Sequence, residues 1–113
     1  MTVIVDITTN RVGRTAVVTP HGDIDLVTSP EFHTAVHAAI DEGATALVID
    51  LSDAGFLDST ALGVLVSAHR RLKDRLAIAA ARPVVQRLFE VTQFTTVLRI
   101  YPTVDGALDD LRP

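Results

Sequence analysis

Cysteine and tryptophan are both absent from this chain of 113 residues. Without a thiol, the protein can form no disulfide, no thiolate zinc site and no cysteine nucleophile. Aromatic residues are also scarce, because four phenylalanines and one tyrosine offer few rings for stacking against nucleic-acid bases. The net charge of −4 provides no basic surface for nucleic acid or for an anionic membrane. We therefore expect no nucleic-acid partner and no membrane partner.

A basic leader and long apolar runs are missing as well. The first residues do not combine a basic start with the apolar run of a secretory signal peptide. No stretch approaches the roughly 20 apolar residues that span a bilayer. These absences favour a cytoplasmic location. The residues that are present, 48% hydrophobic and 21% charged, have an ordinary globular balance, so we expect one domain over residues 1–113.

Apolar runs predict the strands. Apolar and polar residues alternate from Val3 to Ile7, as in a half-buried strand, and a turn at 10–13 leads to a second strand at 15–19. So short a connection indicates an antiparallel hairpin. The segment 46–51 is almost wholly apolar, which is typical of a strand buried on both faces. Two more strands are predicted at 76–80 and 97–101.

Capping residues and apolar periodicity predict the helices. The first helix has a cap at Thr28 or Ser29, the second begins near Ser59, and later ones start at Pro83 and cover 104–111. The second should bury one stripe: Leu62, Leu65, Val66, His69 and Leu72. The third should bury another: Val84, Val85, Leu88, Phe89 and Val91. Helices between strands imply right-handed crossovers, so we predict an α/β fold with a mixed, mostly parallel sheet of about five strands and about four helices.

Polar side chains gather in the segment 50–63, where a buried strand gives way to the second helix. Functional groups in open α/β sheets lie at such strand ends. Gly55 permits a bend there, and Phe56 and Leu57 are expected to turn toward the core. A helix start has free N–H groups and a partial positive charge, which could hold a phosphoryl group on Ser59.

The tripeptide Asp58-Ser59-Thr60 has a simpler interpretation as a helix cap, because Asp, Ser and Thr are all preferred at that position. Two capping side chains would be enough for the helix, so the third polar group is surplus. Spacing alone leaves open whether the surplus group has a function.

The residues around this tripeptide carry a family resemblance. The segments 48–51 and 56–63 together resemble the signature of bacterial anti-sigma factor antagonists, which are members of the STAS domain family. The loop 22–25 resembles that family's Gly-acidic-apolar-Asp loop, and 83–91 resembles its third helix. The matches occur in the right order over nearly the whole chain, so the resemblance implies a single STAS-like domain.

The resemblance also implies a function. Antagonists of this family bind an anti-sigma factor that is also a serine kinase, which frees the sigma factor and regulates transcription by partner switching. The kinase phosphorylates the first Ser of an Asp-Ser-Ser/Thr motif, here Ser59, and a serine phosphatase restores binding. The family's functional Asp corresponds to Asp25. The implied partner-binding surface further comprises Asp23, Asp58, Thr60, Ala61 and Gly63.

Two positions depart from the family pattern. Ala61 stands where many members have Gly, and it is expected to place a methyl group near the kinase-facing surface. Pro20 and His21 precede the acidic loop where an apolar-Thr pair is frequent, so His21 adds a titratable group there. Neither departure removes the acceptor hydroxyl of Ser59.

Rival functions make different demands on the sequence. A response-regulator receiver would use Asp50 as phosphoacceptor, but it also needs an acidic pair after the first strand and a lysine after a later one. The only lysine is Lys73, within a predicted helix. No nucleophile elbow or phosphate-cradling glycine loop is present, so we expect neither an enzyme nor a cofactor. A STAS scaffold or transporter-associated subunit that phosphorylation does not regulate remains an alternative.

Other polar groups have simple interpretations. His33 and His37 stand four residues apart, a spacing that can chelate a metal, but they fall outside the apolar stripe of the first helix. We therefore expect an exposed polar face there and no metal. The basic run 70–75 and the acidic pair Asp109 and Asp110 are likewise expected to be solvated surface.

Overall fold

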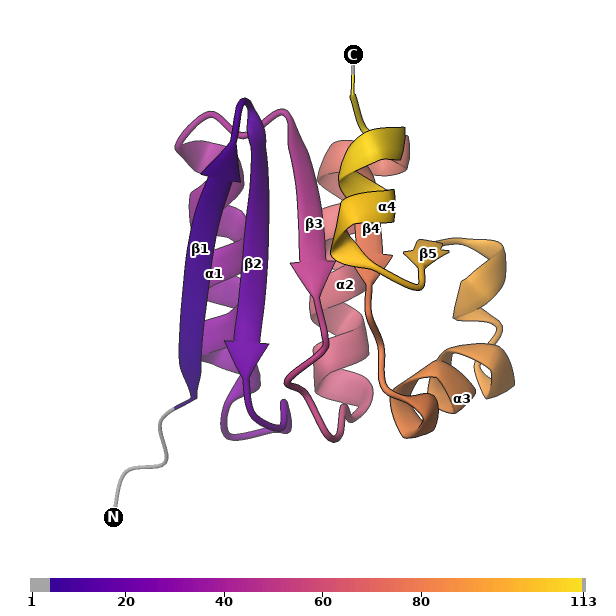
Figure 1. The fold of residues 1–113 in the computed structure, drawn as a ribbon. Coiled ribbons are helices and arrows are strands. Elements are labelled where there is room, and N and C mark those ends of the chain that lie inside the picture. The colour runs from indigo at the N-terminus through magenta and orange to yellow at the C-terminus, as the bar shows by residue number, and fades with distance from the viewer. Residues whose placement is uncertain (1–4, 113) are drawn as a thin grey trace.

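Five strands form one mixed sheet in the computed structural model, which describes residues 5–112 (Figure 1). Strands β1 (Asp6–Val12) and β2 (Thr15–His21) form the antiparallel hairpin. The remaining strands are parallel to β2 and follow in chain order: β3 (Ala46–Asp50), β4 (Leu76–Ala79) and β5 (Arg99–Tyr101). The prediction of a mixed, mostly parallel sheet is confirmed, while Val3 lies outside the described residues.

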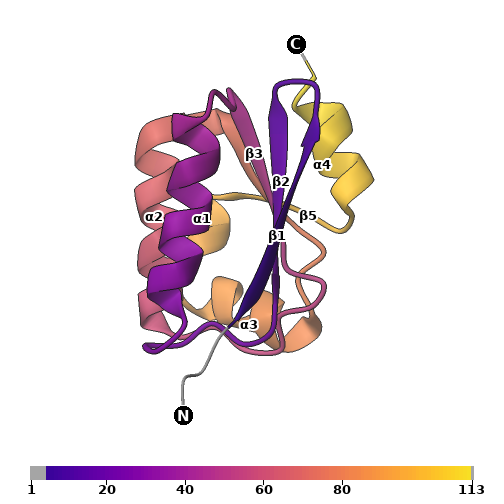
Figure 2. The ribbon, with the colours of Figure 1, turned by 90° about the vertical axis from the view of Figure 1, so that its left-hand side faces the viewer.

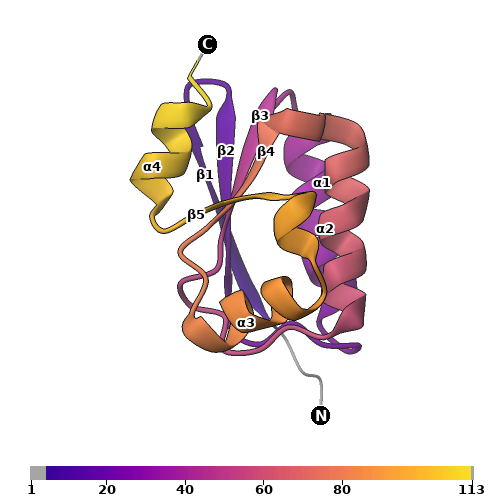
Figure 3. The ribbon, with the colours of Figure 1, turned by 90° about the vertical axis from the view of Figure 1, so that its right-hand side faces the viewer.

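Helices cover both faces of this sheet. Figure 2 shows α1 (Ser29–Asp41) and α2 (Ser59–Leu72) together on one face and α4 (Val104–Asp110) on the other. Figure 3 shows α3 (Pro83–Val91) near the end of the sheet at which β2, β3 and β4 finish. Two short 3₁₀ helices complete the fold: η1 (Lys73–Arg75) and η2 (Phe94–Thr96). Among the described residues, no helix has the length and apolar character needed to traverse a bilayer.

The strands alternate between two apolar cores. Leu47 and Ile49 of β3 face the larger core beneath α1 and α2, whereas Ala46 and Val48 face the smaller one beneath α4. All four side chains have an exposed fraction of 0%. A strand covered on both faces has no polar side to present, which explains why β3 is an almost continuous apolar run.

Some predicted boundaries and stripes are wrong. Strand β1 continues to Val12, so the turn lies at Gly13, whose φ of 63° places it in the left-handed region. In α2 the predicted stripe is rotated, because the helix packs against α1 as well as the sheet and turns small residues inward. Its buried residues are Ala61, Leu62, Val64, Leu65 and Ala68. In α3 Val85 and Phe89 are buried, but Val84 and Val91 are 61% and 67% exposed.

A histidine joins the two helices on the larger core. Nε2 of His37 lies 2.8 Å from Oγ of Ser67, whose hydroxyl donates to the carbonyl of Val64 at 2.7 Å. His37 must therefore donate from Nε2, which leaves Nδ1 to accept from Arg71 at 3.0 Å. Arg71 also pairs with Asp41 of α1 at 2.6 Å. The expected exposed polar face is wrong at His37, which is half-buried, whereas Arg71 is exposed as expected and still forms these contacts.

This network predicts a pH dependence of stability. Burial, followed by the nearby His33 and Arg71, lowers the pKa of His37 from its ordinary 6.5. The unfolded chain therefore binds a proton more readily than the folded one, so stability is full above 6.5 and falls as the pH drops toward the lower folded pKa. We expect the melting temperature to decrease with pH in this window, and the decrease to be smaller in His37→Gln.

The matched control is His69→Gln on α2, which should keep the wild-type pH dependence because the described residues offer this half-buried imidazole no side-chain hydrogen bond. A His37→Gln protein with the full wild-type slope would show that His37 does not carry the effect.

Candidate functional site

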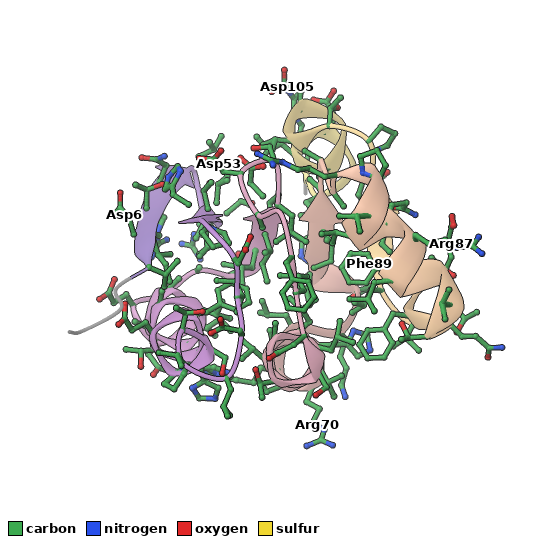
Figure 4. All side chains as sticks on the ribbon, turned by 90° about the horizontal axis from the view of Figure 1, so that it is seen from below. Asp6, Asp53, Arg70, Arg87, Phe89 and Asp105 are labelled. Atoms are coloured by element: carbon green, nitrogen blue, oxygen red, sulfur yellow. The ribbon has the colours of Figure 1, made fainter. Side chains whose placement is uncertain are left out.

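A short parallel bridge joins the loop that follows β2 to the loop that follows β3. The N–H of Ile24 donates to the carbonyl of Phe56 at 3.0 Å, and the N–H of Asp58 donates to the carbonyl of Ile24 at 3.1 Å. Ile24 and its bridge partner Leu57 are buried, with exposed fractions of 0% and 2%. The bridge brings the loop that carries Asp25 to the start of α2. Figure 4 looks onto this end of the molecule.

Asp58 is the residue that caps α2. Its Oδ1 accepts from the backbone N–H groups of Thr60 at 2.9 Å and Ala61 at 3.3 Å, and the hydroxyl of Thr60 also donates to it. The Thr60 hydroxyl is the main cause that lowers the pKa of Asp58, and the N–H groups of Ala61, Thr60 and Leu26 add to it. Asp58 is therefore ionised at neutral pH. The capping interpretation is right for Asp58, and the Thr60 hydroxyl supports that cap by donating to it.

Ser59 is the group left over. It is the first residue of α2 and is exposed, and its hydroxyl forms no hydrogen bond with any of the residues 5–112. The sequence suggested that free N–H groups at the helix start would hold a phosphoryl group on Ser59. That expectation is wrong for Thr60 and Ala61, because Asp58 occupies both of their N–H groups.

Asp25 has a structural task that the sequence pattern did not reveal. Its Oδ1 accepts from the N–H groups of Val27 at 2.9 Å and Thr28 at 3.1 Å, and its carbonyl accepts from Ser29 at 2.8 Å. This is the geometry of an Asx turn that leads into α1. One carboxylate oxygen of the half-buried Asp25 is thus committed to the loop. Its expected place in a partner-binding surface stays a prediction.

Asp23 lies against the backbone of the second loop. A Cβ placed on Gly55 would be 3.0 Å from Oδ1 of Asp23 and 3.7 Å from Nη1 of Arg82. Glycine at this position therefore leaves room for a carboxylate that comes from the neighbouring loop. Asp23 itself is exposed and remains a candidate for contact with a partner.

His21 and Arg82 connect the same loops through Asp53. Nδ1 of His21 lies 2.7 Å from one oxygen of Asp53, and Nη2 of Arg82 lies 3.6 Å from the other. The hydrogen bond from His21 is the main cause that lowers the pKa of Asp53, and the charge of Arg82 contributes. Arg82 also donates from Nε to the carbonyl of Ser52 at 2.9 Å. His21, whose role the sequence could not predict, is thus a cross-link at the edge of the site.

Ala61 and Gly63 lie on different faces of α2. The expectation that Ala61 places a methyl group on the surface is wrong, because its side chain has an exposed fraction of 0% and belongs to the larger core. Gly63 is exposed, and a Cβ there would meet no atom within 4 Å. Gly63 follows Ser59 by four residues, so it shares the helix face of that serine. The helix surface beside Ser59 therefore carries no projecting side chain at position 63 and is open to solvent.

Exposed apolar side chains lie in both loops of the site. Phe56 was expected to turn into the core, but it is 50% exposed, because Leu57 alone occupies the buried position of the bridge. Leu26 and Val27, at the tip of the neighbouring loop, are 72% and 59% exposed. The adjacent apolar residues Leu26 and Val27, inside a loop, were the sequence signal for this surface. They belong to no strand or helix pattern, so the search for periodicity did not find them.

Metal binding has no geometric basis in the part of the chain that the structure describes. No group of three or more His, Asp or Glu side chains within 5–112 is placed to hold an ion. His33 and His37 have ring centres 4.2 Å apart, but His37 uses both ring nitrogens in the network between α1 and α2.

Comparison with known proteins places the chain in a family. The model of the STAS domain matches residues 6–107, which include both loops of the site and all of α2. The chain belongs to the STAS domain family. Among curated STAS proteins, it is 32% identical over 91 residues to the anti-sigma-B factor antagonist of Listeria monocytogenes, covering 78% of this chain and 79% of that relative.

A second curated STAS protein is the anti-sigma-F factor antagonist RsfB of Mycobacterium tuberculosis. It is 29% identical over 99 residues, which cover 86% of this chain and 81% of the relative. A solved STAS structure, that of an anti-sigma factor antagonist from Mycobacterium paratuberculosis, superposes with a TM-score of 0.89 at 31% identity. The alignment covers 96% of this chain and 95% of that one.

The cap geometry predicts different effects on the melting temperature for two neighbouring substitutions. Asp58→Ala removes the acceptor for two backbone N–H groups and one hydroxyl, so we expect a lower melting temperature. Ser59→Ala removes a hydroxyl without a partner in the described structure and should leave the melting temperature near that of the wild type. Thermal unfolding followed by circular dichroism measures both. An equal loss in the two variants would mean that Ser59 takes part in the cap.

Proposed function

We propose that this protein is an anti-sigma factor antagonist whose binding is switched by phosphorylation of Ser59. The observation that carries the proposal is the free, exposed hydroxyl of Ser59, next to an aspartate that already caps the helix. The names of the STAS relatives support the antagonist role, and the Asp58-Ser59-Thr60 motif supports the choice of acceptor. The partner is an anti-sigma factor that is also a serine kinase, and a serine phosphatase restores the binding form.

The binding surface that we propose combines the open helix face with its apolar border. Gly63 lets the partner backbone approach α2 closely beside Ser59. Leu26, Val27 and Phe56 offer apolar area at the edge of that face, and such exposed apolar patches are typical of protein interfaces. Asp23 and Asp25 add negative charge, which would complement a basic patch on the kinase.

Phosphorylation can break this complex without a change of fold. A phosphoryl group adds about −1.5 to −2 charges, and the N–H groups of Thr60 and Ala61 are not free to receive it. Its charge would meet the partner directly, beside the ionised Asp58. Complete switching of an equilibrium from 1:99 to 99:1 needs about 5.5 kcal/mol of difference. Burying the phosphoryl charge in an apolar interface without a partner of opposite charge costs several kcal/mol, which is of that order.

Two variants of Ser59 test the switch. We expect Ser59→Asp to weaken binding to the cognate kinase by at least about tenfold, because an Asp carries only part of the charge of a phosphate. Ser59→Ala should keep the affinity of the unmodified protein but accept no phosphate. Calorimetric titration of each variant with the purified kinase measures the affinities, and phosphopeptide mass spectrometry after incubation with ATP locates the acceptor.

Thr60→Ala is the matched control, because its hydroxyl is already engaged with Asp58. It should still be phosphorylated at Ser59. Tight binding combined with no phosphorylation of the wild-type protein would favour a constitutive STAS scaffold instead. Equal affinities of Ser59→Asp and Ser59→Ala would rule out a switch by charge.

Asp25 requires a substitution that separates its turn from its charge. Asn keeps an oxygen that can accept from Val27 and Thr28, so Asp25→Asn should retain the melting temperature. If Asp25 contacts the kinase as proposed, the lost charge should weaken binding or slow phosphorylation. Asp25→Ala is the contrasting variant, and it should lower both stability and binding. Unchanged affinity of Asp25→Asn would confine this residue to the Asx turn.

A further inference from the structure

A second concave surface lies at the end of the sheet opposite Ser59. It is a cavity of about 530 Å³, bounded by the β1–β2 turn at 12–15, Thr45, Arg75 and side chains of α4. Its volume falls in the range of roughly 300–1,000 Å³ that is typical of small-molecule sites. Figure 1 shows the turn of the hairpin and α4 at the same end of the molecule, and segments far apart in the sequence build the walls.

Two arginines without partners face the cavity. Most arginines of the described chain donate to a carboxylate or a carbonyl, as Arg71, Arg82 and Arg99 do. Arg14 and Arg75 line the cavity, and within residues 5–112 neither forms an ion pair or a side-chain hydrogen bond. Arg75 is half-buried as a residue, whereas Arg14 is exposed.

The other charged groups of the cavity leave part of this positive charge in place. Arg112 pairs with Asp109 at 3.1 Å, so these two side chains neutralise each other. Asp105 also lines the cavity, and its carboxylate offsets part of the remaining positive charge. The lining therefore carries three arginines against two aspartates, an excess of one positive charge in a protein whose net charge is −4.

Apolar side chains complete the wall of the cavity. Val12 is 55% exposed, although it belongs to a strand, and Leu108 of α4 lies among the lining residues. A ligand that used both features would carry a compact anion at one end and an apolar body at the other. A phosphate monoester matches two arginines better than a carboxylate does, because it carries nearly two negative charges and accepts several hydrogen bonds.

We propose that this cavity binds a small phosphate monoester, with its phosphate held by Arg14 and Arg75 and its apolar body against Val12 and Leu108. The site is independent of the switch at Ser59, because the length of β2 and β3 separates them (Figure 1). A partner bound at Ser59 and a ligand in the cavity can therefore occupy the protein together.

Nuclear magnetic resonance with phenyl phosphate as the probe tests this proposal. The ¹⁵N-labelled full chain should show saturable shifts of the amides of Gly13, Arg14 and Thr45. Arg14→Gln and Arg75→Gln should each weaken the affinity by about tenfold, the loss expected for one charge-assisted contact. Asp105→Asn should tighten it, because a carboxylate that repels the phosphate is removed.

Arg70→Gln and Arg87→Gln are matched controls. Both arginines are exposed, and Figure 4 shows them pointing outward from α2 and α3, far from the cavity. They should leave the affinity unchanged. Shifts that never saturate at millimolar probe, or an equal loss in Arg70→Gln and Arg14→Gln, would overturn the proposal. Inorganic phosphate that bound as tightly as phenyl phosphate would overturn the part played by the apolar wall.

Discussion

The pairing of Ile24 with Leu57 is the contact on which the candidate site depends. Strands β2 and β3 are parallel neighbours in the sheet, and the bridge continues their pairing beyond the point where both strands have ended. Two backbone hydrogen bonds and two buried apolar side chains hold the loops together. Everything polar at this end is arranged around that contact: Asp25 turns the chain into α1 on one side, and Asp58 starts α2 on the other. The site is thus an extension of the sheet, and its two loops are held in place by the same backbone pairing that holds neighbouring strands.

Most of the fold follows from apolar patterns in the sequence, and the errors have a common cause. The hairpin, the buried strand β3 and the start of α2 at Ser59 are all found where the patterns place them. The inward faces of α2 and α3 are not, because large apolar residues were assumed to point inward. Alanines such as Ala61 and Ala68 occupy the tight contact instead, while Val84 and Val91 remain outside. Side-chain size alone does not tell which face a neighbouring element will cover.

The candidate site, too, could be predicted only in part. Preference for caps correctly placed Asp58, Ser59 and Thr60 at a helix start, but spacing could not tell which of them would do the capping. That depends on the backbone conformation of Asp58, whose extended φ and ψ aim its carboxylate at the N–H groups of the first turn. The role of His21 was also beyond reach, since Asp53, its partner, belongs to another loop. A contact between segments distant in the sequence decides the role of His21, and no local pattern encodes it.

Because Asp58 caps α2, the residue at position 59 can change without loss of the cap. Because Asp58 and Thr60 secure the helix start, the serine between them contributes little that folding requires. Under the proposed switch, a single substitution at Ser59 removes or restores the acceptor in a chain that still folds. The proposed regulation at Ser59 can therefore diverge between relatives faster than the structure around it.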